Sequence, residues 1–396
     1  MRDCRVSEVL LHFIWKKRYY NHRELATEAG APLFIHHPGE PNTDQGPDFS
    51  NARITIGDST LEGPVELHVK ASDYFRHGHT GDPQYQNVIL HVVWINDTSE
   101  PPAGIPILAL YDRIPTSLIG RYQQFMVSQS VIPCASLLPV NIPWAPFRDQ
   151  LLDQRLAHRT TFIRTLIDEA NPHWSEALYL LIARSLGQPL NTNAFLTIAR
   201  SLPLNFLLRR RSDPTRLETL FKIYASRLDP PLSVYRMRPA HSPAVRLRQL
   251  ADLLNNHTGR FTLLLESDDY APILQTLGAA GLGKTMRNSI LINAIVPLLY
   301  AYGTLRAEPQ LCEKALRWLS ETPPENNHVI RSWRELGMTA HTAADTQALL
   351  ELRKNYCREK KCLDCTIGRH LLTAAPAPPP LPAEAPARAG HASTGQ

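Results

Sequence analysis

The sequence predicts an α/β (α+β) domain with a mixed sheet over residues 1–140, followed by an all-helical domain over residues 141–372. Two observations predict this division. Short β-branched segments separated by turn residues fill the first part, and long amphipathic segments follow from about Trp144. A third observation is that residues 373–396 are rich in Ala and Pro, with almost nothing to bury, which predicts a disordered tail.

The α/β domain is expected to begin with a helix and to continue with strands. Apolar residues from Val6 through Val9 to Ile14 recur at helical spacing, and Ser7 is of a type that caps helices. The segment NVILHVVWI is apolar on both faces, which is typical of a central strand. The predicted strands are residues 31–37, two hairpin arms at 52–58 and 61–70 that turn near Gly57 and Asp58, residues 87–95 and residues 105–112.

The second domain is predicted to be helical because Gly and Pro interrupt its amphipathic segments near Asn171, Gly187 and Asp229. The longest apolar stretch, residues 289–303, contains an Asn and a Pro and falls short of the roughly 18 to 20 apolar residues of a membrane span. It is therefore expected to be a buried helix. Because the N-terminus also lacks a signal-peptide pattern, we expect a cytoplasmic protein without membrane association.

Charge is divided unevenly along a chain whose 43% hydrophobic and 20% charged residues are ordinary for a globular protein. Residues 1–140 carry 11 Lys and Arg against 15 Asp and Glu, a balance of −4, and the remainder carries 31 against 22, a balance of +9. The acidic part suits cations and the basic part suits a polyanion such as nucleic acid. Arg209, Arg210 and Arg211 are either part of such a basic surface or a solvated helix end.

Acidic residues and histidines gather in GPDFSNARITIGDSTLEGPVELHVKASDYFRHGHTGD. In a strand, alternate side chains share a face, so Glu66, His68 and Lys70 lie side by side. If the two hairpin arms pair, Asp48 approaches Glu66 across the sheet. Two carboxylates suit Mg²⁺ or Mn²⁺, and Lys70 or His68 can orient or deprotonate an attacking water.

This arrangement resembles the PD-(D/E)XK nuclease superfamily, in which an Asp at a strand start is followed by Glu/Asp-x-Lys on the next strand. The resemblance implies a restriction-endonuclease-like fold and metal-dependent hydrolysis of phosphodiesters, with Asp48 and Glu66 as metal ligands. Glu8 matches the additional helical acid of many members. The sequence departs from the pattern because His68 holds the usual lysine position and Lys70 follows two residues later.

The histidines of FRHGH allow two further interpretations. This segment, followed by Asp82, is similar to the strand-then-Trp-His-x-His segment of very-short-patch-repair endonucleases, which implies that His77 or His79 assists hydrolysis. A different metallohydrolase could instead bind Zn²⁺ or Mn²⁺ through His68, His77, His79 and His91. These side chains could also simply decorate a polar sheet edge, in which case the protein is a non-catalytic scaffold that binds nucleic acid or protein.

Three cysteines near the C-terminus have the spacing Cys357-x4-Cys362-x2-Cys365, which suits Zn²⁺ or an iron–sulfur cluster in a reducing compartment. The layout resembles that of certain nucleases of the same superfamily, which hold an iron–sulfur cluster with one cysteine before the catalytic core and three after it. The fourth ligand would be one of Cys4, Cys134, Cys312 and His370.

The segment GAAGLGKT, residues 278–285, fits the phosphate-binding pattern G-x-x-x-x-G-K-[ST]. A phosphate loop requires a strand before it, whereas the preceding ESDDYAPILQTL is typical of a helix. These glycines are therefore predicted to form a turn between two helices.

Over nearly its whole length the sequence is also similar to a family of bacterial proteins known as domain of unknown function 2851. The similarity lies in GPDFSNARI, VELHVKASDYFRHGH, NVILHVVW, NAIVPLLYAYG and YCREKKCLDCTIGRHLL. It identifies a family and implies little about activity.

Overall fold

The computed structural model describes residues 6–99, 101–139, 142–169, 173–210, 213–235, 237–255 and 260–374. Cys4, Arg211 and the predicted tail beyond residue 374 lie outside the described residues.

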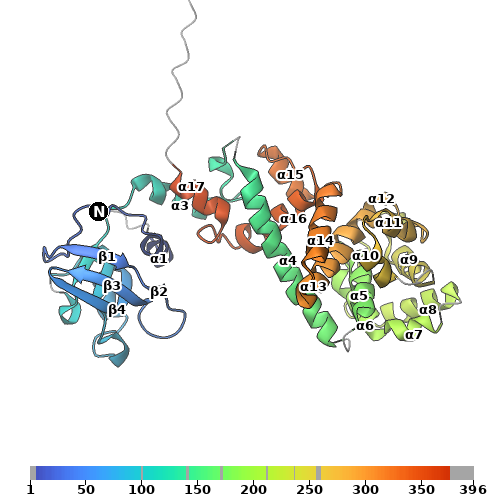
Figure 1. Ribbon diagram of the computed structural model, residues 1–396, viewed down its shortest axis with the longest axis horizontal. Coiled ribbons are helices and arrows are strands. Elements are labelled where there is room, and N and C mark those ends of the chain that lie inside the picture. Colours follow the sequence, from blue (N-terminus) through green and yellow to red (C-terminus); the bar gives the residue numbers. More distant parts are fainter. Residues whose placement is uncertain are drawn as a thin grey trace, which may run out of the picture. The chain divides into compact units, whose positions relative to one another are not determined.

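The chain forms two compact units (Figure 1). One consists of Met1–Gln129 with Cys362–Gln396, and the other of Ser130–Lys361. The first contains the sheet and the second is helical, so the predicted mixed sheet followed by a helical region is confirmed. Residues 362–372, predicted as the end of the helical domain, group with the first unit.

The first unit is built on a mixed sheet with strand order β1-β3-β4-β5-β6, and β2 pairs with β3. Strands β3 and β4 form the predicted antiparallel hairpin, which turns at Gly57 and Asp58. Strand β5 runs parallel to both β4 and β6. The strands are β1 (Leu33–His37), β2 (Glu40–Pro41), β3 (Phe49–Ile56), β4 (Ser59–Lys70), β5 (Leu90–Ile95) and β6 (Ile107–Ala109).

Helix α1 (Glu8–Lys17) packs against β4. Ser7 caps it as predicted, because its Oγ accepts a hydrogen bond of 3.3 Å from the Leu10 N–H. The buried face comprises Leu10, Leu11, Phe13, Ile14 and Trp15, whereas Val9, predicted to belong to the apolar set, is 65% exposed. A polar face of α1, which contains His12, lies beside Asp48 at one end of the β3–β4 hairpin.

Two helices of the first unit that are far apart in the sequence pack on each other. Helix α3 (Thr116–Val127) packs on α17 (Thr366–Thr373), although about 240 residues of sequence separate them. Arg121 fixes this contact by donating a hydrogen bond of 3.0 Å from Nη1 to the Leu371 carbonyl, at the open end of α17.

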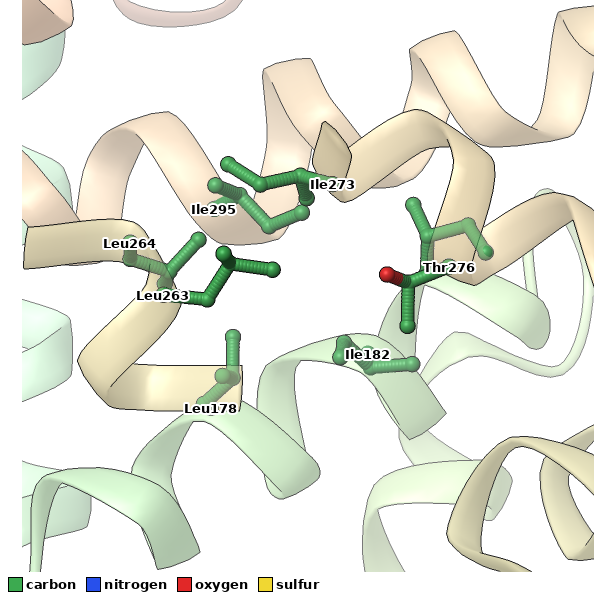
Figure 2. A pocket seen from close by; sticks show the side chains of 8 residues that line it. Leu178, Ile182, Leu263, Leu264, Ile273, Thr276 and Ile295 are labelled. Carbon is green, nitrogen blue, oxygen red and sulfur yellow. The ribbon is translucent and has the colours of Figure 1, made fainter. Parts of the chain in front are cut away.

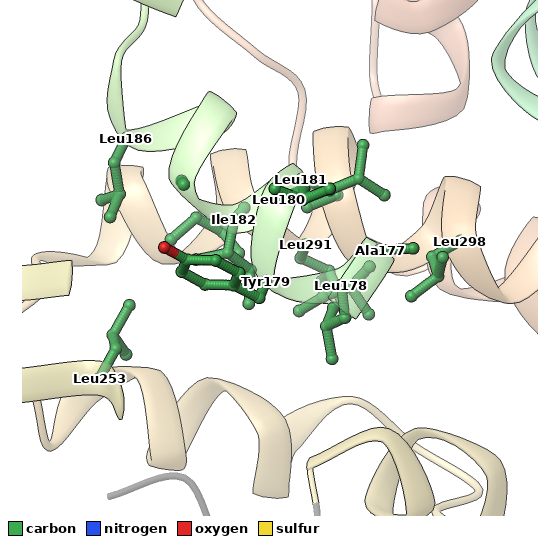
Figure 3. Close-up of a cluster of buried hydrophobic side chains, with 14 of the residues drawn as sticks. Ala177, Leu178, Tyr179, Leu180, Leu181, Ile182, Leu186, Leu253, Leu291 and Leu298 are labelled. Atoms are coloured by element: carbon green, nitrogen blue, oxygen red, sulfur yellow. The ribbon is translucent and has the colours of Figure 1, made fainter. Parts of the chain in front are cut away.

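The second unit surrounds α5 (Trp174–Leu186), in which Ala177 to Ala183 are all buried, as expected of a helix that is apolar on every side. Figure 3 shows Leu253, Leu291 and Leu298 from other helices around it. The other helices are α4 (Trp144–Glu169), α6 (Thr192–Ser201), α7 (Leu204–Leu208), α8 (Pro214–Ala225), α9 (Pro243–Asn255), α10 (Arg260–Glu266), α11 (Ala271–Gly278), α12 (Lys284–Ile290), α13 (Val296–Arg306), α14 (Pro309–Glu321), α15 (His328–Glu335) and α16 (Ala343–Leu352), with π-helical turns at Leu291–Ile295 and Arg353–Cys357.

Helices α11 and α12 flank the glycine-rich segment, since Gly278 ends the first and Gly283 caps the second. The predicted turn between two helices is confirmed, since the element that precedes this loop is helix α11. Nearby, Leu178, Ile182, Leu263 and Ile295 line a small cavity (Figure 2). Its volume of about 10 Å³ is too small for a ligand, and its lining is apolar.

The continuous helix from Lys284 to Arg306 has the length and composition of a membrane span, and 67% of its apolar window is buried inside the protein. It forms the predicted buried helix at residues 289–303 and supplies Ile290 through Val296 to the core of the second unit. A helix covered in this way by its own unit is weak support for a membrane location.

A buried polar contact joins this helix to α4. Arg159 donates from Nη1 to the Asn293 carbonyl at 2.9 Å and from Nη2 to the Asn293 Oδ1 at 2.8 Å. The guanidinium thus binds a carbonyl within the π-helical turn, where the α-helical hydrogen-bond pattern is interrupted. Burial and the neighbouring Arg155 and Arg184 lower the pKa of Arg159, so its charge depends on these acceptors.

Replacing Asn293 by Leu is expected to lower the free energy of unfolding by about 2 to 4 kcal/mol, because it removes an acceptor from a buried guanidinium. It also leaves Glu325, which accepts from the Asn293 Nδ2 at 3.2 Å, without that donor. Urea denaturation measures the effect. The control is Ile292→Leu, an apolar exchange one position earlier that should cost less than about 1.5 kcal/mol. Equal losses in the two variants would show that the polar contact contributes nothing of its own.

Candidate functional site

Asp48 and Glu66 lie together where the β3–β4 hairpin ends. The Asp48 N–H donates to the Glu66 Oε2 at 3.1 Å, and the Leu67 N–H donates to the Asp48 Oδ2 at 2.9 Å. The β3–β4 register shifts between Phe49 and Ala52, and Asn51 there has φ of 55°, so β3 contains a bulge beside Asp48. The structure therefore brings the two predicted carboxylates together and fixes them by reciprocal hydrogen bonds.

Glu66 is held in a site that disfavours its charge. Its side chain is 5% exposed, and burial raises its pKa to about 8, with a further contribution from the charge of Asp48. Glu8 on α1, the third predicted acid, adds the smallest contribution in the same direction. Two carboxylates around one buried position favour binding of either a proton or a cation.

Three histidines complete the cluster. One ring nitrogen from each of His68, His77 and His79 lies within 4.8 Å of the other two. His68 Nε2 is 3.1 Å from His77 Nδ1, and Glu66 Oε1 lies 3.6 Å from His68 Nε2 and 3.4 Å from His79 Nε2. On its other side, His68 Nδ1 is 2.9 Å from His91 Nε2 on β5. We refer to Asp48, Glu66, His68, His77 and His79 as the acid–histidine cluster.

The loop after β4 brings His77 and His79 back to the strand. Asp73 Oδ2 accepts from the Lys70 N–H at 3.2 Å and so ties the first residue of the single-turn helix α2 (Asp73–Arg76) to the end of β4. Gly78 then adopts φ of 78°, a left-handed conformation that L-residues disfavour. The chain turns there, and the His79 ring stacks on Tyr85 with a centroid distance of 3.9 Å.

His68 in the cluster and its neighbour His91 are buried and are neutral near pH 7. Burial, with smaller contributions from neighbouring histidines, lowers the pKa of His68 to about 2. Burial also lowers the pKa of His91 to about 4 and that of His79 below its usual value. A neutral imidazole has a lone pair on one nitrogen, which can bind a metal ion or accept a proton.

Lys70 is the predicted catalytic residue that lies apart from the cluster. Its side chain is exposed at the end of β4, where its charge helps to lower the pKa of Asp97. Among the residues that the structure describes, no hydrogen bond or ion pair joins the Lys70 ammonium to Asp48 or Glu66. The alternation of side chains along β4 predicted Lys70 beside His68, but Lys70 is the last residue of this strand.

His12 is a residue of this site that no sequence motif indicated. Its Nε2 lies 3.3 Å from the Asp48 Oδ2, and its side chain is 36% exposed. The signal was present, because His12 follows Glu8 by four residues and the two therefore share one face of α1. What the sequence did not show is that this face meets the start of β3.

The cysteines occupy separate positions in the chain. Cys357 ends the second π-helical turn in the helical unit, and Cys362 and Cys365 belong to the first unit, each of the three being buried. The Cys365 Sγ accepts from the Gly368 N–H at 3.4 Å and caps α17, and burial raises the pKa of the Cys365 thiol. Binding of Zn²⁺ or an iron–sulfur cluster by these cysteines stays a prediction.

Fold and site together define a protein with an α/β unit, whose hairpin carries a cluster of carboxylates and histidines close enough to hold a metal ion, and a helical unit. The chain belongs to the family described as protein of unknown function (DUF2851), which matches residues 8–229 and 276–328. The matched part includes the whole acid–histidine cluster. No curated protein and no solved structure matches the chain significantly.

Proposed function

We propose that the protein is a divalent-metal-dependent nuclease that hydrolyses phosphodiester bonds at the acid–histidine cluster. The observation that carries this proposal is the meeting of Asp48 and Glu66, where the Glu66 carboxylate accepts from the Asp48 N–H and the Asp48 carboxylate accepts from the Leu67 N–H, with Glu66 buried and Asp48 partly exposed. Like charges held this close are costly unless a cation or a proton neutralises them. Mg²⁺ and Mn²⁺ take carboxylate oxygens and retain waters, which suits a site that still has access to solvent at Asp48.

A further oxygen ligand is available beside the pair. In an extended strand the N–H and C=O of one residue point to the same side, and the Leu67 N–H points to Asp48. The Leu67 carbonyl therefore faces the same edge. Asp48, Glu66 and this carbonyl would hold the cation, which when bound lowers the pKa of a water ligand and stabilises charge on the phosphate.

The hydrolysis itself follows from this arrangement. The oxygen of a water attacks phosphorus, the bond between phosphorus and the leaving oxygen breaks, and the leaving oxygen takes up a proton. A neutral histidine can accept the proton that the water loses. While no metal ion occupies its ring nitrogen, His79 suits this role better than His68, because it is partly exposed and lies 3.4 Å from the Glu66 carboxylate. His68, with a pKa of about 2, is a weak base.

The resemblance to the PD-(D/E)XK superfamily supports the same function, with one difference at the lysine position. His68 occupies that position, and since it is buried and neutral it cannot provide the positive charge of a lysine. In the proposed mechanism the negative charge on the scissile phosphate, which a lysine would offset, would therefore be balanced by the bound cation.

The basic balance of the residues after 140 supports a polyanionic substrate. Of the predicted cationic cluster, Arg210 lies over the Phe206 ring at 3.7 Å and donates to the Phe206 carbonyl at 3.0 Å, so it is partly engaged within its own helix end. Arg209 follows α7 as its C-cap.

The direct test uses full-length protein that has been treated with a chelator and then supplied with Mg²⁺ or Mn²⁺. Single- and double-stranded DNA and RNA are offered as substrates. Cleavage that depends on the added ion supports the proposal, and intact nucleic acid under all of these conditions contradicts it.

Gly78→Ala is expected to reduce cleavage about tenfold through the position of the neighbouring histidines. No atom lies within 4 Å of the added Cβ, so the effect comes from the left-handed backbone, which costs an L-residue about 1 to 2 kcal/mol. Gly30→Ala is the matched control, because Gly30 has φ of 84°, equally open surroundings and a position remote from the cluster. Equal cleavage rates in the two variants would show that the conformation of Gly78 does not position the histidines.

A further inference from the structure

We infer that His68, His77 and His79, with Glu66 as a fourth ligand, form a binding site for a transition-metal ion of the Zn²⁺ class. Occupancy of this site does not require that the protein be a nuclease. It is a second cation site beside the one proposed for Mg²⁺ or Mn²⁺ at Asp48, and the two share the Glu66 carboxylate.

The distances match those around a small tetrahedral ion. Ligand atoms about 2.0 to 2.1 Å from Zn²⁺ in a tetrahedron are about 3.3 Å from one another. In the cluster, His68 Nε2 lies 3.1 Å from His77 Nδ1 and 3.6 Å from Glu66 Oε1, and His79 Nε2 lies 3.4 Å from Glu66 Oε1. The three nitrogens lie within 4.8 Å of one another, so small rotations of the rings suffice to close the set.

The surroundings of His68 are those of a metal ligand. A metal-binding histidine usually donates its second ring N–H to a neighbour that fixes its orientation. Here His68 Nδ1 lies 2.9 Å from His91 Nε2, and His91 is fully buried on β5. When this nitrogen of His68 donates to His91, the lone pair of His68 Nε2 faces His77, His79 and Glu66.

His77 and His79 are oriented from outside the strand. The single-turn helix α2 ends at His77, and the left-handed Gly78 separates it from His79. The His79 ring is held between Tyr85, stacked at 3.9 Å, and Tyr74, edge-on at 5.3 Å. These contacts hold two solvent-accessible histidines in orientations that face the buried His68. Such fixed orientations are expected of metal ligands and are not required of a polar surface loop.

The two carboxylate oxygens of Glu66 face different cation sites. Oε1 faces His68 and His79, and Oε2 accepts from the Asp48 N–H. Three imidazole nitrogens and one carboxylate oxygen favour Zn²⁺ and its transition-metal neighbours, whereas Mg²⁺ prefers oxygen ligands and an octahedral shell. The ion at the histidines should therefore be held tightly, while Mg²⁺ at Asp48 should exchange.

The test measures metal binding by the full-length protein, purified without a polyhistidine tag. Zn²⁺ content is determined by elemental analysis after dialysis, and Co²⁺ is titrated into chelated protein while its visible absorption is recorded. The variants are His77→Ala and His79→Ala, whose side chains are at least partly exposed and should not unfold the protein. His36→Ala is the control, since His36 is an exposed histidine on β1 that contacts Thr55 at 2.8 Å.

We expect the wild type and His36→Ala to bind Co²⁺ with the visible bands of nitrogen and oxygen ligands. Each cluster variant should bind it about 100-fold more weakly. Binding that is unchanged in His77→Ala and His79→Ala would overturn the inference. So would Co²⁺ that shows only the intense near-ultraviolet band of thiolate ligands, because the ion would then be at cysteines.

Asp48→Asn separates this inference from the proposed function. The variant should retain the ion at the histidines while it loses cleavage. If the wild type binds Zn²⁺ at the histidines and cleaves no nucleic acid, the metal site stands and the nuclease proposal fails. If cleavage occurs without any ion at the histidines, the nuclease proposal stands and the metal site is wrong.

Discussion

Asp48→Asn should reduce metal-dependent cleavage about 1,000-fold, which corresponds to about 4 kcal/mol of lost transition-state stabilisation. The substitution removes one negative charge from the proposed cation site and keeps an oxygen that can accept from the Leu67 N–H, so the hairpin end should remain folded. Binding to nucleic acid should be unchanged or slightly stronger, because removing negative charge cannot weaken attraction to a polyanion. Cleavage rates and a binding titration in Ca²⁺ measure the two effects separately.

Asp44→Asn is the matched control for this prediction. Asp44 lies four residues earlier in the same connection, is exposed, and loses the same charge on substitution. Its cleavage rate should equal that of the wild type. A loss of the same size in Asp44→Asn would mean that overall charge, and not a ligand at Asp48, accounts for the effect.

The part of the site that local sequence determines was predictable. Residues 52–70 alternate with period two around Gly57 and Asp58, and this pattern forms a hairpin whatever lies beside it. The hairpin brings Asp48 close to Glu66, and the bulge between Phe49 and Ala52, which the alternation does not indicate, sets the final register. Lys70 was placed on the same face by the same alternation, but β4 ends at that residue and its side chain lies in solvent.

The remainder of the site depends on contacts between distant segments. His91 meets His68 because β5 pairs in parallel with β4 in a register that sets His91 opposite Glu66. His12 meets Asp48 because α1 packs on β4. Neither the strand register nor the helix packing is contained in a short motif, so spacing alone could not indicate them.

The loop between β4 and β5 is an intermediate case. The 16 residues between Lys70 and Asn87 allow at most a short helix, and α2 is one turn long. Convergence of His77 and His79 on His68 required the left-handed Gly78 and the stacking on Tyr85. A glycine between two histidines is compatible with many loop shapes. The sequence alone therefore allows His77 and His79 to be metal ligands, general bases or polar residues at the edge of the sheet.

Glu66→Gln is expected to abolish cleavage and also to stabilise the metal-free protein at neutral pH. Glu66 has its pKa raised to about 8, chiefly by burial and then by Asp48. In the unfolded chain the same carboxyl has its ordinary pKa of 4.5. Between these two values the folded protein holds a proton that the unfolded chain has lost, so stability falls as the pH rises through this window.

The size of the effect follows from the same linkage. At pH 7 the buried carboxyl costs about 3 kcal/mol, since each pKa unit corresponds to 1.36 kcal/mol. A glutamine has no charge to lose, and its amide oxygen can still accept from the Asp48 N–H.

Hydrogen–deuterium exchange of peptides covering β4 and β5, with a chelator present, measures this local stability. Exchange in the wild type should become faster relative to Glu66→Gln as the pH rises from 4.5 to 8, after correction for the intrinsic rate, and the two should coincide near pH 4.5. Glu62→Gln, an exposed residue on the same strand whose side chain is 73% exposed, should behave like the wild type. Added Mg²⁺ should slow exchange in the wild type and have little effect in Glu66→Gln, because a cation neutralises the carboxylate that the substitution has removed. If the two proteins differ equally at every pH, Glu66 is not the group whose charge the fold opposes.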